Sequence, residues 1–240
     1  VKGFVIGISG GIDSAVTSTL CAKTGLKVKC LEMPIHQAEN QVSRALRHID
    51  WLKENFDDVE LQQVNLTPVF DSLLESLPKV ENEEDRFMSL ANTRARLRMT
   101  SLYYFAALES LLVAGTGNKV EDFGVGFYTK YGDGGVDLSP IADLLKTEVY
   151  EIAEHLGIHE EILTAAPTDG LWGDDRTDED QIGATYPELE WAMHMDDLGK
   201  TADNFEGRKL EVFKIYKKLN TANQHKMQPI PVCEIPLNLK

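Results

Sequence analysis

A short apolar run that ends in paired glycines constrains this chain more than any other feature. Residues 4–8 are FVIGI, and SGGIDSAV follows them directly. A continuous apolar run of this length, bounded by glycine, is typical of a strand that is buried on both faces of a parallel sheet. We therefore predict a strand over residues 4–9 and a helix over residues 13–23. The glycines between them allow a ligand to come very close to the backbone.

The same alternation of strand and helix continues in the residues that follow. The pattern predicts a strand over residues 27–33, a helix over residues 37–55 and a strand over residues 59–64. Strands and helices in alternation form right-handed βαβ units. The expected fold is therefore α/β: an open, mostly parallel, doubly wound sheet with helices on both faces.

The second part of the chain is less regular. Residues 78–85, PKVENEED, are acidic and have few large apolar side chains, which predicts a surface linker. Residues 167–180 are rich in Asp, Gly and Thr, a composition that is typical of a functional loop or of disorder. The regular elements expected here are a helix over residues 86–110, a strand over 111–115, a helix over 146–156, a helix that begins at HEEIL, and helices until residue 219.

The composition favours one domain and disfavours several partners. The 240 residues, of which 42% are hydrophobic, suit a single domain over residues 1–240. A net charge of −15 disfavours nucleic acid as a partner. The longest apolar stretch, residues 102–115, is interrupted by Glu109 and is too short to span a membrane. Because the chain starts at Val1 without a methionine, we expect an N-terminal segment to be missing.

The cysteines indicate a reducing environment. They are far apart, odd in number and without metal-ligand spacing, so they are expected to be free thiols of a cytoplasmic protein: Cys21, Cys30 and Cys233.

The loop SGGIDS has the features of a phosphate site. Its glycines let successive backbone N–H groups point at an anion, and the following helix adds the positive end of its dipole. The hydroxyls of Ser9 and Ser14 can donate to phosphate oxygens, whereas the carboxylate of Asp13 is better suited to hold a Mg²⁺ ion that bridges phosphates. The loop matches neither G-x-x-x-x-G-K nor G-x-G-x-x-G. A plain tight turn with a helix cap is the alternative interpretation.

The loop resembles the pyrophosphatase loop of the ATP-pyrophosphatase superfamily, whose members split ATP between its α- and β-phosphates. Three further motifs follow it: N-x-x-A-R-x-R-M in residues 92–99, G-T-x-N-K in residues 115–119, and T-K-Y-G-D-G-G in residues 129–135. In this order, the four motifs resemble the NAD synthetases, which amidate deamido-NAD. The resemblance extends from residue 3 to about residue 231.

The resemblance implies a role for each matching residue. ATP would be bound by Ser9, Gly10, Gly11, Ile12, Asp13, Ser14, Arg96, Thr116, Lys146 and Thr168. Deamido-NAD would be bound by Asn92, Lys130, Asp133, His225 and Lys226. The magnesium ion, the implied cofactor, would be held by Asp13 and Glu121. Asp13 and Lys146 would be the catalytic residues.

Two departures from the family pattern leave alternatives open. Many members have T-A-D-L where this chain has T-D-G-L in residues 168–171, so the role of Asp169 is open. The stretch from Glu121 to Phe127 is about one residue longer than in short bacterial members, so Asp122 competes with Glu121 for the metal position. Trp172 lies in the Asp- and Gly-rich segment, which could fold over ATP.

The resemblance also implies a reaction and its participants. The nicotinate carboxylate would attack the α-phosphorus of ATP to give an acyl-adenylate and pyrophosphate, and ammonia would then displace AMP. Mg²⁺, Lys146 and the loop N–H groups are suited to stabilise the charge on the phosphates. Glutamine-using relatives carry an extra amidase domain. This chain of 240 residues is therefore expected to depend on free ammonia, unless a partner subunit or a missing segment supplies the ammonia. A homodimer is expected on resemblance alone.

Two rival functions share part of the pattern. Another amidating or thiolating ATP-pyrophosphatase, such as the synthetase domain for GMP, would share the loop but has no reason to contain T-K-Y-G-D-G-G. A regulatory module that binds ATP without turnover has little use for a pair of carboxylates beside phosphate, here Asp13 and Glu121.

Overall fold

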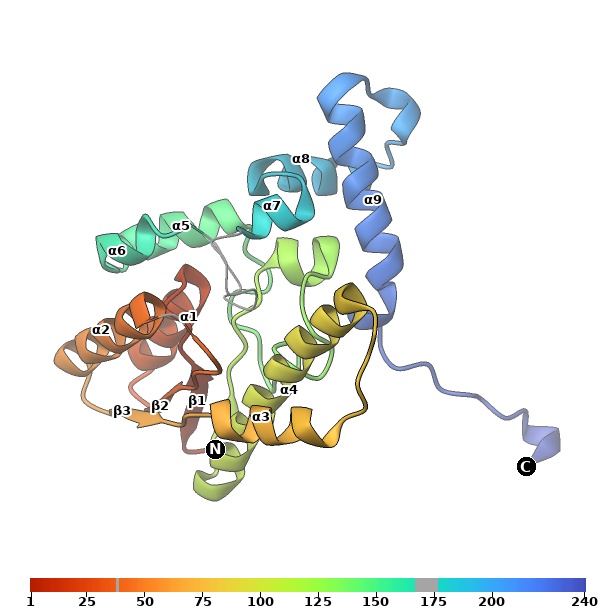
Figure 1. Ribbon diagram of the computed structural model, residues 1–240. Coiled ribbons are helices and arrows are strands. Elements are labelled where there is room, and N and C mark those ends of the chain that lie inside the picture. The colour runs from red at the N-terminus through yellow and green to blue at the C-terminus, as the bar shows by residue number, and fades with distance from the viewer. Residues whose placement is uncertain (38, 167–176) are drawn as a thin grey trace.

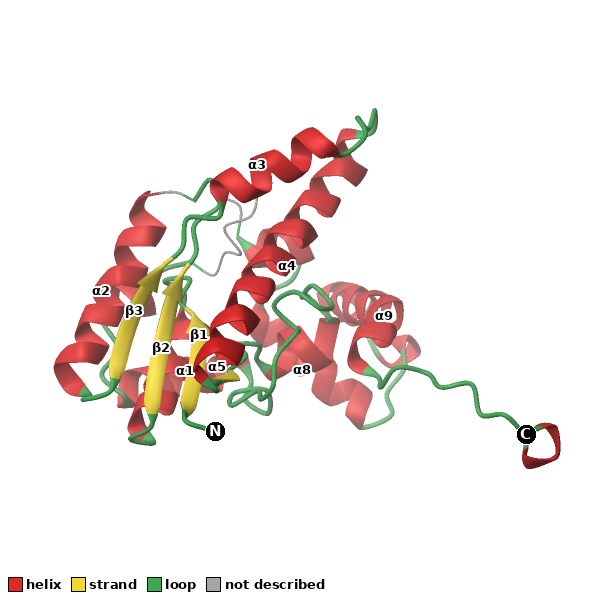
Figure 2. Cartoon of the chain, turned by 90° about the horizontal axis from the view of Figure 1, so that it is seen from below, coloured by secondary structure: helices red, strands yellow, loops and turns green. Residues whose placement is uncertain are grey.

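The computed structural model describes residues 1–37, 39–166 and 177–240, and its centre is the expected parallel sheet. In the described part of the chain, four strands pair in the order β3-β2-β1-β4. They are β1 (Gly3–Gly7), β2 (Lys27–Glu32), β3 (Val59–Gln63) and β4 (Leu112–Val113). All their pairings are parallel, as the arrows in Figure 2 show for the first three strands. The predicted open α/β sheet is thus confirmed.

The strand order creates a switch point. The chain moves from β1 outward to β2 and β3, and then returns to place β4 on the other side of β1. The loops that leave the carboxyl ends of β1 and β4 therefore diverge, and ligands of open α/β sheets bind in the crevice between such loops.

Helices cover both faces of this sheet, as predicted, and pack at its end (Figure 1). The α-helices with the bounds described are α1 (Ile12–Lys23), α2 (Glu39–Asn55), α3 (Thr67–Ser76), α4 (Glu83–Glu109), α5 (Lys146–His155), α6 (Glu160–Leu163), α7 (Asp178–Ile182), α8 (Tyr186–Asp197) and α9 (Gly207–Met227). Shorter turns are the π-helix η1 (Val120–Val125) and the 3₁₀-helices η2 (Ala202–Asn204) and η3 (Leu237–Leu239).

The side chains of β1 point alternately to the two faces of the sheet, and the core therefore has two layers. Ile6 packs with Cys30 of β2, Ile49 of α2 and other residues of α1 and α2 on one face of the sheet. Val5, its neighbour in the chain, packs on the opposite face with Phe70 of α3 and other residues of α3 and α4. Successive side chains of a strand point to opposite faces, so a strand buried on both sides has to be apolar throughout.

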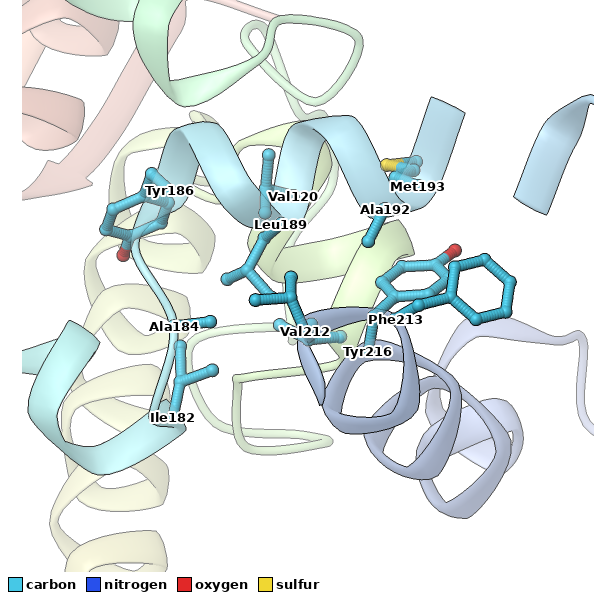
Figure 3. Packing of buried hydrophobic residues seen from close by; sticks show 11 residues of the cluster. Val120, Ile182, Ala184, Tyr186, Leu189, Ala192, Met193, Val212, Phe213 and Tyr216 are labelled. Atoms are coloured by element: carbon cyan, nitrogen blue, oxygen red, sulfur yellow. The ribbon is translucent and has the colours of Figure 1, made fainter. Parts of the chain in front are cut away.

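A separate helical layer carries the far wall of the crevice. Leu189 of α8 and Val212 of α9 point toward one another in Figure 3, and both pack with Val120 of η1. Tyr186, at the start of α8, belongs to the same buried cluster. This packing fixes η1, which follows β4, against helices that come much later in the chain.

Several predicted boundaries were wrong. The pattern did not predict α3, which begins at a Thr-Pro pair and buries Phe70. The predicted linker over residues 78–85 ends inside the first turn of α4, and helix α9 continues past residue 219 to Met227. The predicted loop over residues 167–180 includes the start of α7, because the hydroxyl of Thr177 accepts the N–H of Asp180 and caps this helix. Residues 167–176 lie outside the described ranges.

The π-helix η1 occupies most of the segment that we expect to be about one residue longer than in short bacterial members. It contains Glu121 and Asp122 and ends at Gly126, whose φ of 67° places it in the left-handed region. A π-helix fits one more residue into a turn than an α-helix does, and such turns are frequent at functional sites. A turn of this kind would take up the expected additional residue locally, within η1.

The cysteines are in the state that the sequence predicts. Cys21, Cys30 and Cys233 are free thiols, of which the first two are buried in the core. Over the described ranges, no helix is sufficiently long and apolar to cross a membrane.

A pair of glycine substitutions tests the contact between the loop after β1 and α2. A Cβ on Gly10, at φ 81°, would lie 2.8 Å from the carbonyl oxygen of Gln41, whereas a Cβ on Gly25, at φ 73°, would meet nothing within 4 Å. Gly25→Ala should lower the free energy of unfolding by about 1 kcal/mol, from backbone strain alone. Gly10→Ala should lower it by roughly 2–4 kcal/mol, because α2 has to move as well. Urea unfolding measures the free energy of unfolding of both variants. Equal decreases in the two would contradict the close contact between Gly10 and α2.

A buried histidine should make stability depend on pH. His48 is 1% exposed, and its Nε2 lies 2.9 Å from the hydroxyl of Ser18. Burial, followed by the nearby His159, lowers the pKa of His48 from 6.5 to about 4. As the pH falls from 6.5 to 4, the unfolded chain takes up a proton that the folded chain refuses, so the free energy of unfolding should fall by on the order of 3 kcal/mol. In His48→Gln, the free energy of unfolding, measured with urea between pH 7 and pH 4.5, should lose most of this dependence on pH. An unchanged dependence would exclude His48 as its source.

Candidate active site

A cleft of about 920 Å³ opens at the switch point of the sheet. The loop after β1, the loop after β4, α4 and the end of α9 all contribute to its walls. It is lined by nearly all the side chains that the sequence singled out: Ser9, Gly11, Ile12, Asp13, Ser14, Asn92, Arg96, Thr116, Glu121, Lys130, Asp133, Lys146, His225 and Lys226. Gly10 instead packs against α2, and Thr168 lies outside the described residues.

Internal hydrogen bonds hold the loop after β1 in shape. The hydroxyl of Ser14 donates to the carbonyl oxygen of Gly11 at 2.9 Å, and the N–H of Gly11 donates to the hydroxyl oxygen of Ser9 at 3.2 Å. The two hydroxyl oxygens lie 3.1 Å apart. Because Ser14 donates its hydrogen to Gly11, Ser9 is the donor between the two hydroxyls, and it has to rotate away from Ser14 to donate to a bound anion. Gly11 also precedes α1, whose positive end faces the same cleft.

A lysine and two carboxylates meet at the centre of the cleft. The Lys146 Nζ donates to Asp13 Oδ2 at 2.5 Å and to Glu121 Oε1 at 3.0 Å. Lys146 is buried, and burial alone would lower its pKa, but the two carboxylates outweigh that effect and raise the pKa. Lys146 therefore carries its positive charge at neutral pH, which makes it a donor to anions rather than a base.

Neighbouring donors orient the two carboxylates. Asn118 donates from Nδ2 to Asp13 Oδ1 at 3.1 Å, and the Tyr186 hydroxyl donates to Glu121 Oε1 at 2.6 Å. Burial raises the pKa of Asp13 against the opposing charge of Lys146. Burial acts in the same direction on Glu121, but Lys146 and the Tyr186 hydroxyl prevail and lower its pKa. The cluster thus holds one ammonium against carboxylates from two different loops.

This donor set fits a magnesium ion. The oxygens of Asp13 and Glu121 already converge on one cation, the Lys146 ammonium, and carboxylate oxygens together with substrate phosphates are the usual ligands of Mg²⁺. Within the described ranges, no group of three or more His, Cys, Asp or Glu side chains could hold a metal by itself. Phosphate oxygens would therefore have to complete the coordination.

The structure distinguishes Glu121 from Asp122 as the candidate for the metal position. Glu121 lines the cleft, whereas Asp122 lies against the backbone at Gly117, where a Cβ would be 2.2 Å from its Oδ2. Burial, then the charges of Glu121, Asp133 and Asp13, raises the pKa of Asp122 to about 7. Because Glu121 lines the cleft and Asp122 does not, the geometry favours Glu121 for the metal position.

The residues expected at the dinucleotide hold the T-K-Y-G-D-G-G loop in place. Asn92 accepts a hydrogen bond from the Thr129 hydroxyl at 2.6 Å, and Asp133 accepts the N–H of Thr129 at 2.9 Å. Lys130 donates to the carbonyl oxygen of His225. Arg96 donates to the carbonyl oxygen of Lys130 at 3.3 Å.

The end of α9 closes the same loop from the other side. Lys226 donates to the carbonyl oxygens of Gly126 at 2.8 Å and of Tyr128 at 2.7 Å. The side chain of His225 is exposed, and its Nδ1 lies 3.2 Å from the carbonyl oxygen of Ala222. In this arrangement, Lys226 positions the loop, while His225 leaves its imidazole at the rim of the cleft.

Sequence reasoning assigned no role to two residues of the cluster. Asn118 lies inside the G-T-x-N-K motif, where a polar residue shortly after a buried strand could have been assigned to a carboxylate. Tyr186 is separated from Glu121 by 65 positions, and no local pattern marks it.

Comparisons with known proteins identify the family of the chain. A model of the NAD synthase family matches residues 1–230. The chain belongs to this family. As a member of this family, the chain is a ligase of the class that forms NAD. This confirms the resemblance identified in the sequence. The two rival functions, another ATP-pyrophosphatase and a non-catalytic ATP module, are therefore poor descriptions of the chain.

Relatives cover most of the chain. An NH₃-dependent NAD⁺ synthetase of Carboxydothermus hydrogenoformans is 41% identical to this chain over 195 residues. The aligned part covers 79% of this chain and 75% of the relative. It is 35% identical to the corresponding synthetase of Methanosarcina acetivorans, with 98% of this chain and 91% of the relative covered.

Solved structures show the same fold. An NMN synthetase from Francisella tularensis superimposes with a TM-score of 0.81 at 32% identity and covers 98% of this chain and 90% of that chain. An NH₃-dependent NAD synthetase from Campylobacter jejuni gives a TM-score of 0.75 at 27% identity, with coverages of 97% and 90%.

Three isosteric variants test which carboxylates hold the metal. If these two carboxylates hold Mg²⁺, Asp13→Asn and Glu121→Gln should each slow ATP-dependent pyrophosphate release by about a hundredfold or more at ordinary magnesium concentrations, because each would remove a metal ligand. Asp122→Asn, the matched control, should stay within about threefold of the unsubstituted chain, since its carboxyl group turns away from the cleft. Pyrophosphate release is measured against magnesium concentration, and thermal unfolding checks that each variant is folded. A severe loss in Asp122→Asn with normal release in Glu121→Gln would reverse the assignment.

Proposed function

We propose that this chain uses ATP and Mg²⁺ to amidate deamido-NAD with ammonia, and that it forms NAD, AMP and pyrophosphate through an adenylated intermediate. The observation that carries the proposal is the convergence of Lys146, Asp13 and Glu121 beside the SGGIDS loop, in a cleft that also contains the T-K-Y-G-D-G-G loop. Family membership supports the product, and the names of the curated relatives support ammonia as the nitrogen source.

The loop after β1 would bind the phosphates of ATP. Its backbone N–H groups and the Ser9 hydroxyl donate to the β- and γ-phosphates, and the start of α1 adds favourable charge. Asp13 and Glu121 would hold the magnesium ion, which on binding supplies positive charge to the phosphates. Thr116 also lines the cleft and would contact ATP, together with Arg96.

Lys146 would act on the reacting phosphate. Its charge is maintained by the two carboxylates, so it can donate to a non-bridging oxygen of the α-phosphate while the nicotinate carboxylate attacks phosphorus. A new P–O bond forms to the nicotinate, and the bond to the bridging oxygen breaks, so that pyrophosphate leaves. Negative charge accumulates on these oxygens, and Lys146 offsets it.

The second step needs positioning more than a base. Ammonia attacks the carbonyl carbon of the adenylate, the C–O bond to AMP breaks, and the proton that nitrogen loses can pass to solvent. Asn92, Lys130, Asp133, His225 and Lys226 would hold deamido-NAD in the orientation that both steps require. A carboxylate attacks phosphorus without deprotonation, so the lack of an acid–base dyad in our assignment is consistent with the chemistry.

The likeness to the Francisella tularensis protein favours a second candidate acceptor. That protein is an NMN synthetase, and its fold superimposes on this chain over 98% of the residues. Amidation of the mononucleotide would use the same phosphate loop and the same cluster around Lys146. It would not need the part of the cleft that receives the adenylate half of deamido-NAD.

Two further expectations from the sequence remain predictions. We retain the homodimer implied by the resemblance, which the mass of the protein in solution would test. Tyr104 and Leu108 are exposed one turn apart on α4, as a self-association surface would require. The cytoplasmic location also remains a prediction.

One assay tests the function and the acceptor together. Purified protein receives ATP, Mg²⁺ and ammonium with either deamido-NAD or nicotinate mononucleotide, and pyrophosphate is measured alongside the amidated product. We expect NAD and pyrophosphate in equal amounts with deamido-NAD, and turnover with the mononucleotide at least about tenfold slower.

The outcomes separate the candidates. Faster amidation of the mononucleotide would replace deamido-NAD as the acceptor. Pyrophosphate without either amide would show that a different carboxylate is adenylated, and no product with a folded protein would contradict the proposal.

A further inference from the structure

One cation in the cleft is not accounted for by the assigned roles. Arg44 of α2 lines the cleft beside the loop after β1, yet no hydrogen bond or ion pair joins it to any residue in the described ranges. Its Nε is buried without an acceptor. A buried donor without a partner carries a free-energy cost, so its persistence calls for an explanation.

The other cations of the cleft differ from Arg44 in this respect. Lys146 is paired with Asp13 and Glu121, and Arg98 donates to the carbonyl oxygen of Met33 at 3.1 Å. Arg96, Lys130 and Lys226 each donate to a backbone carbonyl oxygen, as described above. Arg44 therefore lines the cleft and has N–H donors that no described residue accepts.

The backbone places Arg44 directly at the phosphate loop. Gly10 packs so closely on α2 that a Cβ there would lie 3.2 Å from the Cβ of Arg44 and 3.1 Å from the backbone nitrogen of Ala45. The arginine side chain thus begins at the middle of SGGIDS. Lys146 reaches the same loop at Asp13, from α5.

The chemistry of the side chain indicates its ligand. A guanidinium presents Nε and Nη donors in a planar fork that matches two oxygens of one phosphate, and it remains charged at any physiological pH. The two carboxylates and the ammonium around Lys146 have a combined charge of −1 when all are ionised, so they do not by themselves attract a polyphosphate. A further cation beside the loop would compensate for this.

We propose that Arg44 binds the β- and γ-phosphates of ATP and retains the pyrophosphate formed from them. This proposal rests on the function proposed above, since it concerns the same nucleotide site. Arg44 is a binding residue for the leaving group, and it takes no part in the attack of ammonia.

The test compares two arginines of the same helix. Arg44→Gln keeps a long polar side chain without the charge, and Arg47→Gln is the matched control, because Arg47 is exposed one turn later and pairs with Glu161. Calorimetry with Mg²⁺ measures the Kd of pyrophosphate and the Kd of AMP for each variant. Arg44→Gln should weaken pyrophosphate binding about tenfold or more and leave AMP within about twofold, since AMP has no β- or γ-phosphate. Arg47→Gln should change neither.

Turnover adds an independent measurement. Arg44→Gln should raise the KM for ATP by a similar factor, with an unchanged KM for deamido-NAD and an unchanged melting temperature. Unaltered pyrophosphate affinity in Arg44→Gln, an equal loss for AMP, or an equal loss in Arg47→Gln would overturn the proposal. If the unsubstituted chain binds pyrophosphate through Arg44 but makes no NAD, the Arg44 assignment stands and the proposed function fails.

Discussion

The contact between the buried ammonium of Lys146 and the carboxylates of Asp13 and Glu121 joins three separate pieces of the chain. Asp13 follows β1, Glu121 lies in the π-helix after β4, and Lys146 is the first residue of α5. Removing one member of a buried ion pair leaves an uncompensated charge, at a typical cost of about 3–5 kcal/mol. The same contact therefore sets the spacing between the diverging loops of the switch point and fixes the position of the reactive centre.

The helical layer outside the sheet determines how that contact is oriented. The Tyr186 hydroxyl reaches Glu121 from the start of α8, and Tyr186 is itself held in the apolar cluster of α8, α9 and η1 (Figure 3). Asn118 connects the other half, because its Oδ1 accepts the N–H groups of Val120 and Glu121 while its Nδ2 donates to Asp13. Packing far from the cleft thus limits the rotation of both carboxylates, as a precise metal site requires.

The sequence predicted what depends on neighbours in the chain. The loop after β1 could be identified because the strand, the glycines, Asp13 and the helix start all lie within fourteen residues of one another. The motif residues of the cleft could be assigned through a family resemblance, and the cleft brings all but Gly10 and the undescribed Thr168 into its walls. Short elements with one buried side chain, such as α3 with Phe70, carry too little periodicity to be recognised.

Contacts between distant segments could not be predicted in this way. Helix α9 continues to Met227 because Asn223 and Lys226 bind carbonyl oxygens of residues 125–128, nearly a hundred positions earlier. The same long-range contacts bring His225 to the rim of the cleft. A sequence pattern shows which face of a helix is apolar, but the length of a helix end that is stabilised by another loop depends on where that loop lies. The extent of α9 is thus a property of the site it helps to form.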